Sequence, residues 1–361
     1  MKNKKENEKV AVVRCASYEQ SRVDRAVYRA LKLIKFNPLN RTKVLIKPNV
    51  VVAGRKHQIA ISTQPALIKA VCKFLKDNEC TIYIGESSFM STDLFLKQSG
   101  INKIARKYAK GRKPLVFEQE KLIKIYDKSA RVLKKIEMAR IVKEVDYIID
   151  MPKMKTHMLA KYTGAIKNLY GLIPGGMKQK LHNYARDEKK FSELLVDIYQ
   201  NVKPQLTIMD AIVGMEGHGP TSGHPKKAGL ILASRNAVAL DIAATKIMQI
   251  NPKEVYHIAE AVKRGFYPNF NFELAGLKKL PLIHFRKAHI EKRKKVIKGL
   301  FREVPIVVDE GKCVKCGICA KYCPAKAIRL APYPVINRKK CIRCFCCMEV
   351  CPKHALSLKA K

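Results

Sequence analysis

Short apolar runs alternate with amphipathic stretches over about the first 275 residues. Runs rich in β-branched residues predict strands at Val10–Arg14, Lys43–Val52, Thr81–Gly85, Tyr147–Asp150, Leu206–Asp210 and Gly229–Ser234. Apolar residues recur at helical spacing in Ser21–Lys35 and Ala237–Gln249, and Thr63 is a suitable N-cap for a helix with Pro65 in its first turn. Strands that alternate with helices predict a three-layer α/β domain around a mostly parallel sheet.

The last fifty residues contain an internal repeat. Asp309–Leu330 aligns with Asn337–Leu358 at an offset of 28 residues, and each copy contains the pattern C-x2-C-x2-C-x3-C-P. Two complete copies are typical of a bacterial-type ferredoxin module with two [4Fe–4S] clusters, in which the fourth cysteine of each copy binds the cluster of the other copy. The predicted ligands are Cys313, Cys316, Cys319 and Cys351 for the first cluster, and Cys341, Cys344, Cys347 and Cys323 for the second.

Four cysteines lie outside this pattern. Cys346 directly precedes a predicted ligand and is expected to pack beside the cluster without binding iron. Cys15, Cys72 and Cys80 are expected to be buried thiols, because no secretory signal points to an oxidising compartment.

The predicted chain organisation has three parts. An α/β domain covers residues 10–277, a basic connector covers 278–303, and a small α+β ferredoxin-like 2[4Fe–4S] domain covers 304–361. The connector is expected to be partly helical, either as a solvated linker or as a docking surface for an acidic partner.

Charge and hydropathy restrict the partners. The chain has 72 Lys and Arg against 30 Asp and Glu, a formal net charge of +42. The lysines are scattered and no nucleic-acid motif is present, so an acidic redox protein is favoured over nucleic acid. No apolar run reaches the roughly 18–20 residues of a membrane span, and a cytoplasmic location is expected.

Polar side chains follow the predicted strands where ligands gather in an open parallel sheet. Lysines, a histidine and nearby glycines favour a small anion such as a carboxylate or phosphate. The candidate ligand-binding residues are Lys47, Asn49, Glu86, Lys167, Asn168, Gly175, Gly176 and Asp210, and the candidate catalytic residues are Lys153, Lys155 and His157. Some of these residues have plainer interpretations. Lys153 or Lys155, taken alone, is interpreted as a surface lysine, and His157 as a hydrogen-bonded loop residue. Asp241 is interpreted as a residue that caps or pairs near a helix start, and Gly175 and Gly176 as a turn.

Four stretches resemble a known family. They are Leu45–Asn49, Pro152–His157, Thr163–Gly175 and Asp210–Pro220, and together with their order they resemble domain of unknown function 362 over roughly residues 10–275. The resemblance implies an α/β domain that often precedes a ferredoxin module, and it implies no particular reaction. The usual Gly-Asn-Gly-Pro of the family reads Gly217-His218-Gly219-Pro220 here, which leaves any role of the second position open.

Two further comparisons bear on the cofactor. Lys167–Gly175 is faintly similar to a loop of nickel-pincer lactate racemase-like proteins. No G-x-G-x-x-G follows an early strand, so the sequence does not support a bound flavin or nicotinamide.

These observations leave three functional hypotheses. The first is an iron–sulfur oxidoreductase that passes electrons between a carrier and an anionic ligand held by the α/β domain. The second is a ferredoxin-like electron carrier whose large domain only docks partners. The third is a non-redox anion-binding or racemase-like domain with structural clusters.

Overall fold

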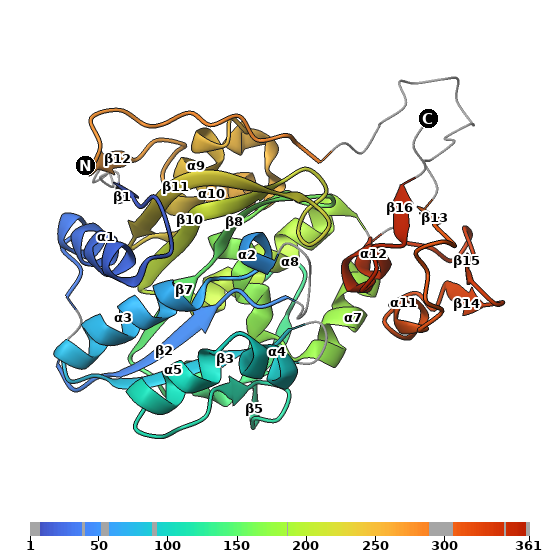
Figure 1. Cartoon of the computed structure of the whole chain (residues 1–361), viewed down its shortest axis with the longest axis horizontal. Helices are drawn as coiled ribbons and strands as arrows, with labels where there is room; N and C mark the ends of the chain where they lie inside the picture. The colour runs from blue at the N-terminus through green and yellow to red at the C-terminus, as the bar shows by residue number, and fades with distance from the viewer. Residues whose placement is uncertain are drawn as a thin grey trace.

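A computed structural model describes residues 8–37, 40–51, 58–88, 92–185, 187–288, 306–342 and 344–358. Its centre is a sheet in the order β12-β1-β11-β10-β7-β2-β3-β4 (Figure 1). The bounds are β12 Glu273–Ala275, β1 Lys9–Arg14, β11 His224–Ser234, β10 Leu206–Glu216, β7 Tyr147–Met151, β2 Lys43–Pro48, β3 Thr81–Glu86 and β4 Leu115–Val116. Two further strands, β8 (Lys153–His157) and β9 (Lys161–Thr163), extend the sheet beside β10.

Most of the sheet is parallel, as the sequence predicts. Leu45 of β2 lies beside Ile148 of β7 and Tyr83 of β3, and both neighbours run parallel to it. The exception within the main path is β11, which runs antiparallel to both β10 and β1. The carboxyl ends of β2, β3, β7 and β10 therefore point to one common edge of the sheet.

Helices cover both faces of the sheet and make the three layers (Figure 1). One face carries α1 (Gln20–Leu33), α3 (Pro65–Asp77) and α5 (Ile101–Tyr108). The other face carries α6 (Ala165–Asn168), α8 (Glu188–Val202), α9 (Ala237–Ile247) and α10 (Tyr256–Lys263). Shorter elements lie at the edges: α2 Gln58–Ile61, α4 Thr92–Gln98, α7 Gly175–Tyr184, and the hairpin β5 Leu122–Tyr126 with β6 Lys135–Ala139.

The two apolar layers explain why β2 reads as a continuous apolar run. Val44 and Ile46 pack in the core under α1 and α3, while Leu45 packs in the core under the opposite helices, and all three are fully buried. A strand covered on both faces needs apolar residues at every position, since successive side chains point to opposite faces.

The start of α3 differs from the prediction. The N-cap of α3 is Gln64, whose side chain makes no capping hydrogen bond, and Pro65 is the first helical residue. The hydroxyl of Thr63 instead donates to the carbonyl of Met151 at 2.6 Å and accepts from the amide of Asn49 at 2.9 Å. Thr63 therefore ties the ends of β2 and β7 together.

The C-terminal module has the predicted α+β composition. Its antiparallel pairs are β13 (Ile306–Val308) with β16 (Leu356–Leu358), and β14 (Ile328–Leu330) with β15 (Pro334–Ile336). Its helices are α11 (Ile318–Lys321) and α12 (Cys346–Val350). The described part of the connector, residues 278–288, contains no helix, and the rest of the connector lies outside the described residues, so its partial helicity stays a prediction.

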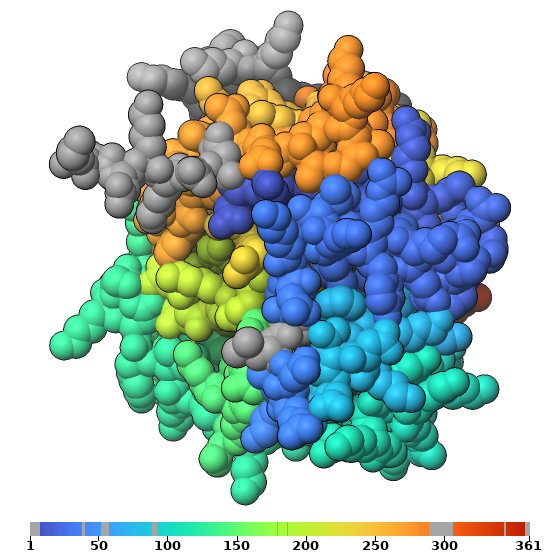
Figure 2. All heavy atoms as spheres, turned by 90° about the vertical axis from the view of Figure 1, so that its left-hand side faces the viewer, coloured from blue at the N-terminus to red at the C-terminus, as the bar shows by residue number. Residues whose placement is uncertain are grey.

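The module packs against the carboxyl edge of the sheet, on the side of α7 (Figure 1). The face shown in Figure 2 is on the opposite side of the α/β domain, where the N-terminal elements, in blue and cyan, lie next to the orange residues that end the domain.

Candidate functional site

A buried ion pair links the ends of two neighbouring parallel strands. Lys47 Nζ of β2 lies 2.6 Å from Glu86 Oε2 of β3, and both side chains are at most 1% exposed. The other carboxylate oxygen accepts from the amide of Ser87 at 2.8 Å. A Cβ added to Gly171 would lie 2.0 Å from Glu86 Oε1, so the absence of a side chain at Gly171 lets its backbone lie against the pair. Burial raises the pKa of Glu86, and Lys47 opposes this shift.

A second ion pair forms where β8 runs beside β10. Lys153 Nζ lies 2.8 Å from Asp210 Oδ2, and neither side chain is exposed. The hydroxyl of Tyr18 accepts from Lys153 Nζ at 2.7 Å and donates to Asp210 Oδ1 at 2.8 Å. Burial lowers the pKa of Lys153, and Asp210 opposes the shift. Tyr18 was missed by the sequence analysis because it lies 192 residues from Asp210 and outside every motif.

Lys155 differs from these two lysines because its hydrogen-bond acceptors are neutral. Its Nζ donates to Asn49 Oδ1 and to the carbonyl of Ile61, both at 2.8 Å. Burial lowers its pKa well below the usual value, and the charges of Lys167 and Lys153 add to the effect. With amide acceptors and no carboxylate at ion-pair distance in the described ranges, the neutral amine of Lys155 is favoured, and an anion bound beside it would favour the charged form.

A chain of amides connects Lys155 to the end of β7. Asn49 Nδ2 donates to Asn168 Oδ1 at 3.0 Å, and Asn168 Nδ2 donates to Asp150 Oδ1 at 2.7 Å. The second oxygen of Asp150 is buried without a hydrogen-bond partner among the described residues. Burial raises the pKa of Asp150 well above its usual value, so the neutral acid is favoured.

The hydrogen bonds of His157 fix its tautomer. Its Nδ1 accepts from the amides of Leu159 and Ala160, both at 3.1 Å, so the proton of the neutral ring is on Nε2. Burial, followed by the charges of Lys167 and Lys155, lowers the pKa of His157 well below its usual value. Nε2 has no hydrogen-bond partner in the described part of the chain, and it points to Glu349 Oε1 of the C-terminal module at 3.8 Å.

Glu349 brings negative charge from the module to the edge of the sheet. Its side chain is 15% exposed, and burial raises its pKa to about 7, with Lys167 and Lys155 opposing the shift. Lys167 is half-buried, and its Nζ lies 5.6 Å from the ring centre of Phe191. Lys155, His157 and Lys167 thus form the part of the site that faces α12.

Other contacts hold the module in place. The hydroxyl of Thr221 donates to the carbonyl of Glu349 at 3.3 Å, and Ser222 Oγ lies 3.2 Å from His354 Nδ1. Met158 packs into the apolar core of the module beside Phe345. The loop that carries Thr221 also lies against β8, where a Cβ on Gly219 would come within 2.0 Å of the carbonyl of Thr156.

The structure corrects two expectations about the site and agrees with a third. Residues 153–157 form strand β8 instead of a loop, so Lys153 and Lys155 are interior residues and not surface lysines. Gly175 and Gly176 begin helix α7 instead of forming a loop or turn against a ligand. Asp241 accepts from the amides of Ala165 and Ile166 at the start of α6, which agrees with the simpler interpretation that it pairs near a helix start.

Lys178 belongs to the same edge and was not among the predicted residues. It is buried on α7, and its Nζ donates to the carbonyl of Ser87 and, at 3.0 Å, to Ser87 Oγ. Burial lowers its pKa to about 8, and Glu86 opposes the shift. Lys178 lies three residues after Gly175, and no motif in the sequence marks it as a site residue.

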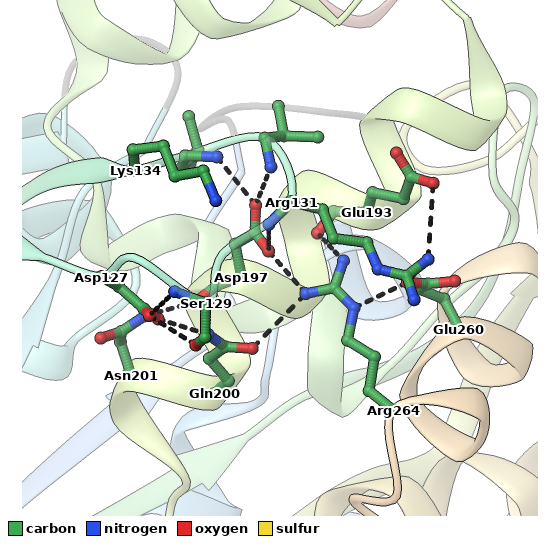
Figure 3. Close-up of polar contacts among 12 residues, drawn as sticks. Asp127, Ser129, Arg131, Lys134, Glu193, Asp197, Gln200, Asn201, Glu260 and Arg264 are labelled. Atoms are coloured by element: carbon green, nitrogen blue, oxygen red, sulfur yellow. Dashed lines mark hydrogen bonds and ion pairs between the residues drawn. The ribbon is translucent and has the colours of Figure 1, made fainter.

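A second polar network lies away from this edge and fastens the connection between β5 and β6 to α8 and α10 (Figure 3). Asp197 accepts from the amides of Arg131, Val132 and Leu133 at 2.7–3.0 Å and from Arg264 Nη1 at 2.5 Å. Every oxygen of this carboxylate is used, so the network is structural.

The predicted cluster ligands fall into two sets in the C-terminal module. One cavity is lined by Cys313, Cys316, Cys319 and Cys351, and another is lined by Cys323, Cys341, Cys344 and Cys347. No three His, Cys, Asp or Glu side chains in the described ranges come together closely enough for a single metal ion. Thiolates spread around a cavity, three from one copy and one from the other, fit a [4Fe–4S] cluster better than zinc.

Backbone amides support the two crossing cysteines. The amide of Ala327 donates to Cys323 Sγ and the amide of Ala355 donates to Cys351 Sγ, both at 3.2 Å. Hydrogen bonds of this kind stabilise thiolate ligands and help to set the potential of a cluster. Cys346 is buried, and its thiol lies 3.9 Å from the carbonyl of Cys344, while Cys15, Cys72 and Cys80 are buried as predicted.

The fold and the cysteine motif define an α/β protein with a C-terminal 4Fe–4S binding module, and residues 306–329 match the family described as 4Fe-4S binding domain. Residues 44–246 match the family described as Domain of unknown function (DUF362). The chain belongs to this family.

One curated protein and one solved structure show similarity to the chain. The "Thylakoid-associated protein sll1697" of Synechocystis sp. is 28% identical over 257 residues, which are 69% of this chain and 74% of that protein. The lactate racemase apoprotein from Thermoanaerobacterium thermosaccharolyticum is 11% identical with a TM-score of 0.40, over 68% of this chain and 57% of the racemase. The chain thus spans little more than half the length of the racemase. Within the described part of the chain, none of the helices has the length and apolar character required to cross a membrane.

Proposed function

We propose that the protein transfers electrons between two [4Fe–4S] clusters and a small anionic ligand at the carboxyl edge of the sheet. The contact of α12 with this edge is the observation that carries the proposal, because Glu349 Oε1 lies 3.8 Å from His157 Nε2. The helix that contains Cys347 therefore adjoins the residues that the sequence singles out for ligand binding. An electron-transfer module placed against a ligand site suits a redox reaction on that ligand.

The residues of the edge divide into two groups in this proposal. Lys155, Lys167 and His157 would contact the ligand. Neither of the two lysines has a carboxylate at ion-pair distance in the described ranges, and only the longer-range field of Glu349 opposes the effect of burial on them. An anionic ligand would favour their charged forms. Lys47 and Lys153 are neutralised by Glu86 and Asp210, so they would position the strand ends.

The chemistry of the clusters determines how many electrons the protein would transfer to the ligand. When bound, each [4Fe–4S] cluster accepts and releases one electron. A ligand that takes up two electrons would require one from each cluster, with an external one-electron carrier protein as the reductant. The neutral His157, with its proton on Nε2, is placed to donate a hydrogen bond to the ligand. A cytoplasmic location and the domain bounds 10–277, 278–303 and 304–361 are part of the proposal.

Anaerobic iron and acid-labile sulfide analysis, with EPR before and after dithionite, tests the cofactor. We expect about eight irons per chain and the spectrum of two interacting reduced clusters. About four irons or fewer after reconstitution, or zinc in their place, would contradict the two-cluster assignment.

Reoxidation of the dithionite-reduced protein by small carboxylates and phosphate esters tests the ligand. A compound that reoxidises the wild type should do so at least about tenfold more slowly with Lys155→Met, and Lys103→Met on α5 is the matched control. A compound that reoxidises both variants equally is not bound at the proposed edge.

A second candidate function is a non-enzymatic electron carrier whose α/β domain only docks partners. The full internal pairing of Lys47 and Lys153 favours it, because these lysines need no ligand. Fast electron exchange with no small-molecule turnover would select this function. A racemase-like activity that survives deletion of residues 304–361 would select the third hypothesis, with structural clusters.

A further inference from the structure

The two copies of the cysteine motif present different surfaces. In the second copy, α12 is covered by the α/β domain, and Phe345 and Met348 are 6% and 3% exposed. In the first copy, the loop before α11 is exposed: Val314 is 56% exposed and Cys316 is exposed as well. The first cluster is therefore the one closer to solvent.

The residues at equivalent positions of the two copies also differ in size and charge. With the offset of 28 residues, Gly317 corresponds to Phe345, Ala320 to Met348, Lys321 to Glu349 and Lys326 to His354. All four second-copy residues pack in the module core beside Met158 or make the docking contacts already described. The first copy has small or basic residues at these positions, so its face has no equivalent apolar anchor for the α/β domain.

We propose that the exposed face of the first copy is the docking surface for an acidic one-electron carrier protein. The first-cluster surface consists of Val314, Lys315, Cys316, Leu330 and Lys353. Val314, Cys316 and Lys353 line the cavity of the first cluster, and Leu330 lies beside Gly317, where a Cβ would approach it to 3.2 Å. The proposal rests on the proposed function, since the carrier is the external reductant of that scheme.

The chemistry of this surface fits such a partner. Val314 and Leu330, which is 44% exposed, give an apolar centre next to the cluster. The first copy carries Lys312, Lys315, Lys321, Lys326 and Arg329 against Asp309 and Glu310, and Lys353 adds a further positive charge. Asp309 is paired with Lys312, which leaves the other basic side chains to attract acidic groups. An apolar centre with a charged rim is the usual form of a transient protein interface.

Stopped-flow mixing tests the surface on the full chain with reconstituted clusters. The probe is a reduced plant-type [2Fe–2S] ferredoxin with an acidic surface, mixed anaerobically with the oxidised protein at low and high salt. We expect the rate of cluster reduction to fall as salt rises, and Lys315→Glu/Lys353→Glu to slow it at least about tenfold at low salt. The matched control is Lys32→Glu/Lys103→Glu on α1 and α5, which changes the net charge equally on the far side of the α/β domain.

The outcomes separate this proposal from the proposed function. Equal rates for the two double variants, with normal iron content and full reduction by dithionite, would overturn the docking surface and leave the proposed function intact. A protein without clusters would overturn both. If the Lys315/Lys353 variant loses binding to anionic phosphatidylserine vesicles but keeps the ferredoxin rate, the surface binds lipid and the proposal of a protein carrier is wrong.

Discussion

The first and second copies of the cysteine motif have the same ligand spacing but different surroundings. Cys316 of the first copy is exposed, whereas the corresponding Cys344 is half-buried. Cys344 is close enough to the α/β domain for its charge to contribute to the raised pKa of Tyr170. At positions where the first copy has small or basic residues, the second copy has Phe345, Met348 and Glu349. These three residues lie at the contact with the α/β domain. The comparison teaches that the two copies can share the cysteine pattern proposed to bind the clusters, while contact with the α/β domain depends on the residues between these cysteines.

Loss of one ligand from either copy gives the largest expected effect. Cys316→Ala and Cys344→Ala should each reduce the iron content from about eight to about four per chain, because each removes one ligand of a different cluster. Hydrogen exchange of α12 should rise more in Cys344→Ala than in Cys316→Ala, since α12 contains Cys347 of the second set, whereas Cys351 of the first set lies at its end.

Cys346→Ala is the control for this experiment. It removes a thiol next to Cys347 that lines neither cavity, so about eight irons should remain. Loss of iron from this variant would contradict the ligand assignment of the second copy.

Loss of the buried ion pair between Lys47 and Glu86 gives the next largest effect. It should destabilise the α/β domain without a different effect on the two copies of the cysteine motif. Lys47→Met leaves Glu86 buried without its partner and should lower the free energy of unfolding by about 3–5 kcal/mol. Urea unfolding followed by circular dichroism measures the change. The double variant Lys47→Met/Glu86→Leu should recover most of it, and a double variant as unstable as the single one would refute the role of the uncompensated charge.

Replacement of Phe345 by the equivalent residue of the first copy, a glycine, tests the difference between the copies directly. Phe345 has a φ of 59°, in the left-handed region, where the first copy has Gly317 with a φ of 71°. Phe345→Gly removes backbone strain of about 1 kcal/mol but also removes a buried ring worth about 3 kcal/mol. We expect the contact between the module and the α/β domain to weaken by about 2 kcal/mol, measured as faster hydrogen exchange at β8 and α12.

The reciprocal change is Gly317→Ala. It should cost about 1 kcal/mol through the positive φ and leave the exchange of β8 unchanged, because Gly317 is not at the domain interface. Faster exchange at β8 in this variant would show that both copies contribute to docking.

The smallest effect is a pH dependence that belongs to the α/β domain alone. His257 on α10 is fully buried, its ring nitrogens have no hydrogen-bond partner among the described residues, and burial lowers its pKa from 6.5 to about 3. The unfolded chain therefore binds a proton first, and the stability contributed by His257 is present above pH 6.5 and is lost as the pH falls. Between pH 6.5 and 5 the loss should be about 2 kcal/mol.

His257→Leu should remove this part of the slope in urea unfolding at the two pH values. The iron content should be unchanged, since His257 lines neither of the cysteine cavities. An identical slope in wild type and variant would show that His257 finds a proton acceptor in the folded chain.

The sequence was informative about elements whose residues lie close together in the chain. The strands, their parallel arrangement and the grouping of the cysteines follow from local periodicity and spacing, because both faces of the sheet are covered and each metal loop is short. The strand β8 could not be predicted from the sequence, since alternating lysines and a histidine are not typical of a strand interior.

Contacts between distant segments could not be predicted from spacing. Tyr18 with Asp210, and Lys178 with Ser87, each bridge more than ninety residues, and neither Tyr18 nor Lys178 stands in a motif.

The sequence by itself determined the α/β class, the duplicated iron–sulfur motif and the lysines at the edge of the sheet. Only the tertiary structure decided which lysines are neutralised, because the partners Glu86 and Asp210 reach them from other strands. The tertiary structure also decided that the second copy faces the α/β domain while the first faces solvent. The two copies share their ligand pattern, so the choice depends on shape and charge complementarity with a surface that exists only after the sheet has folded.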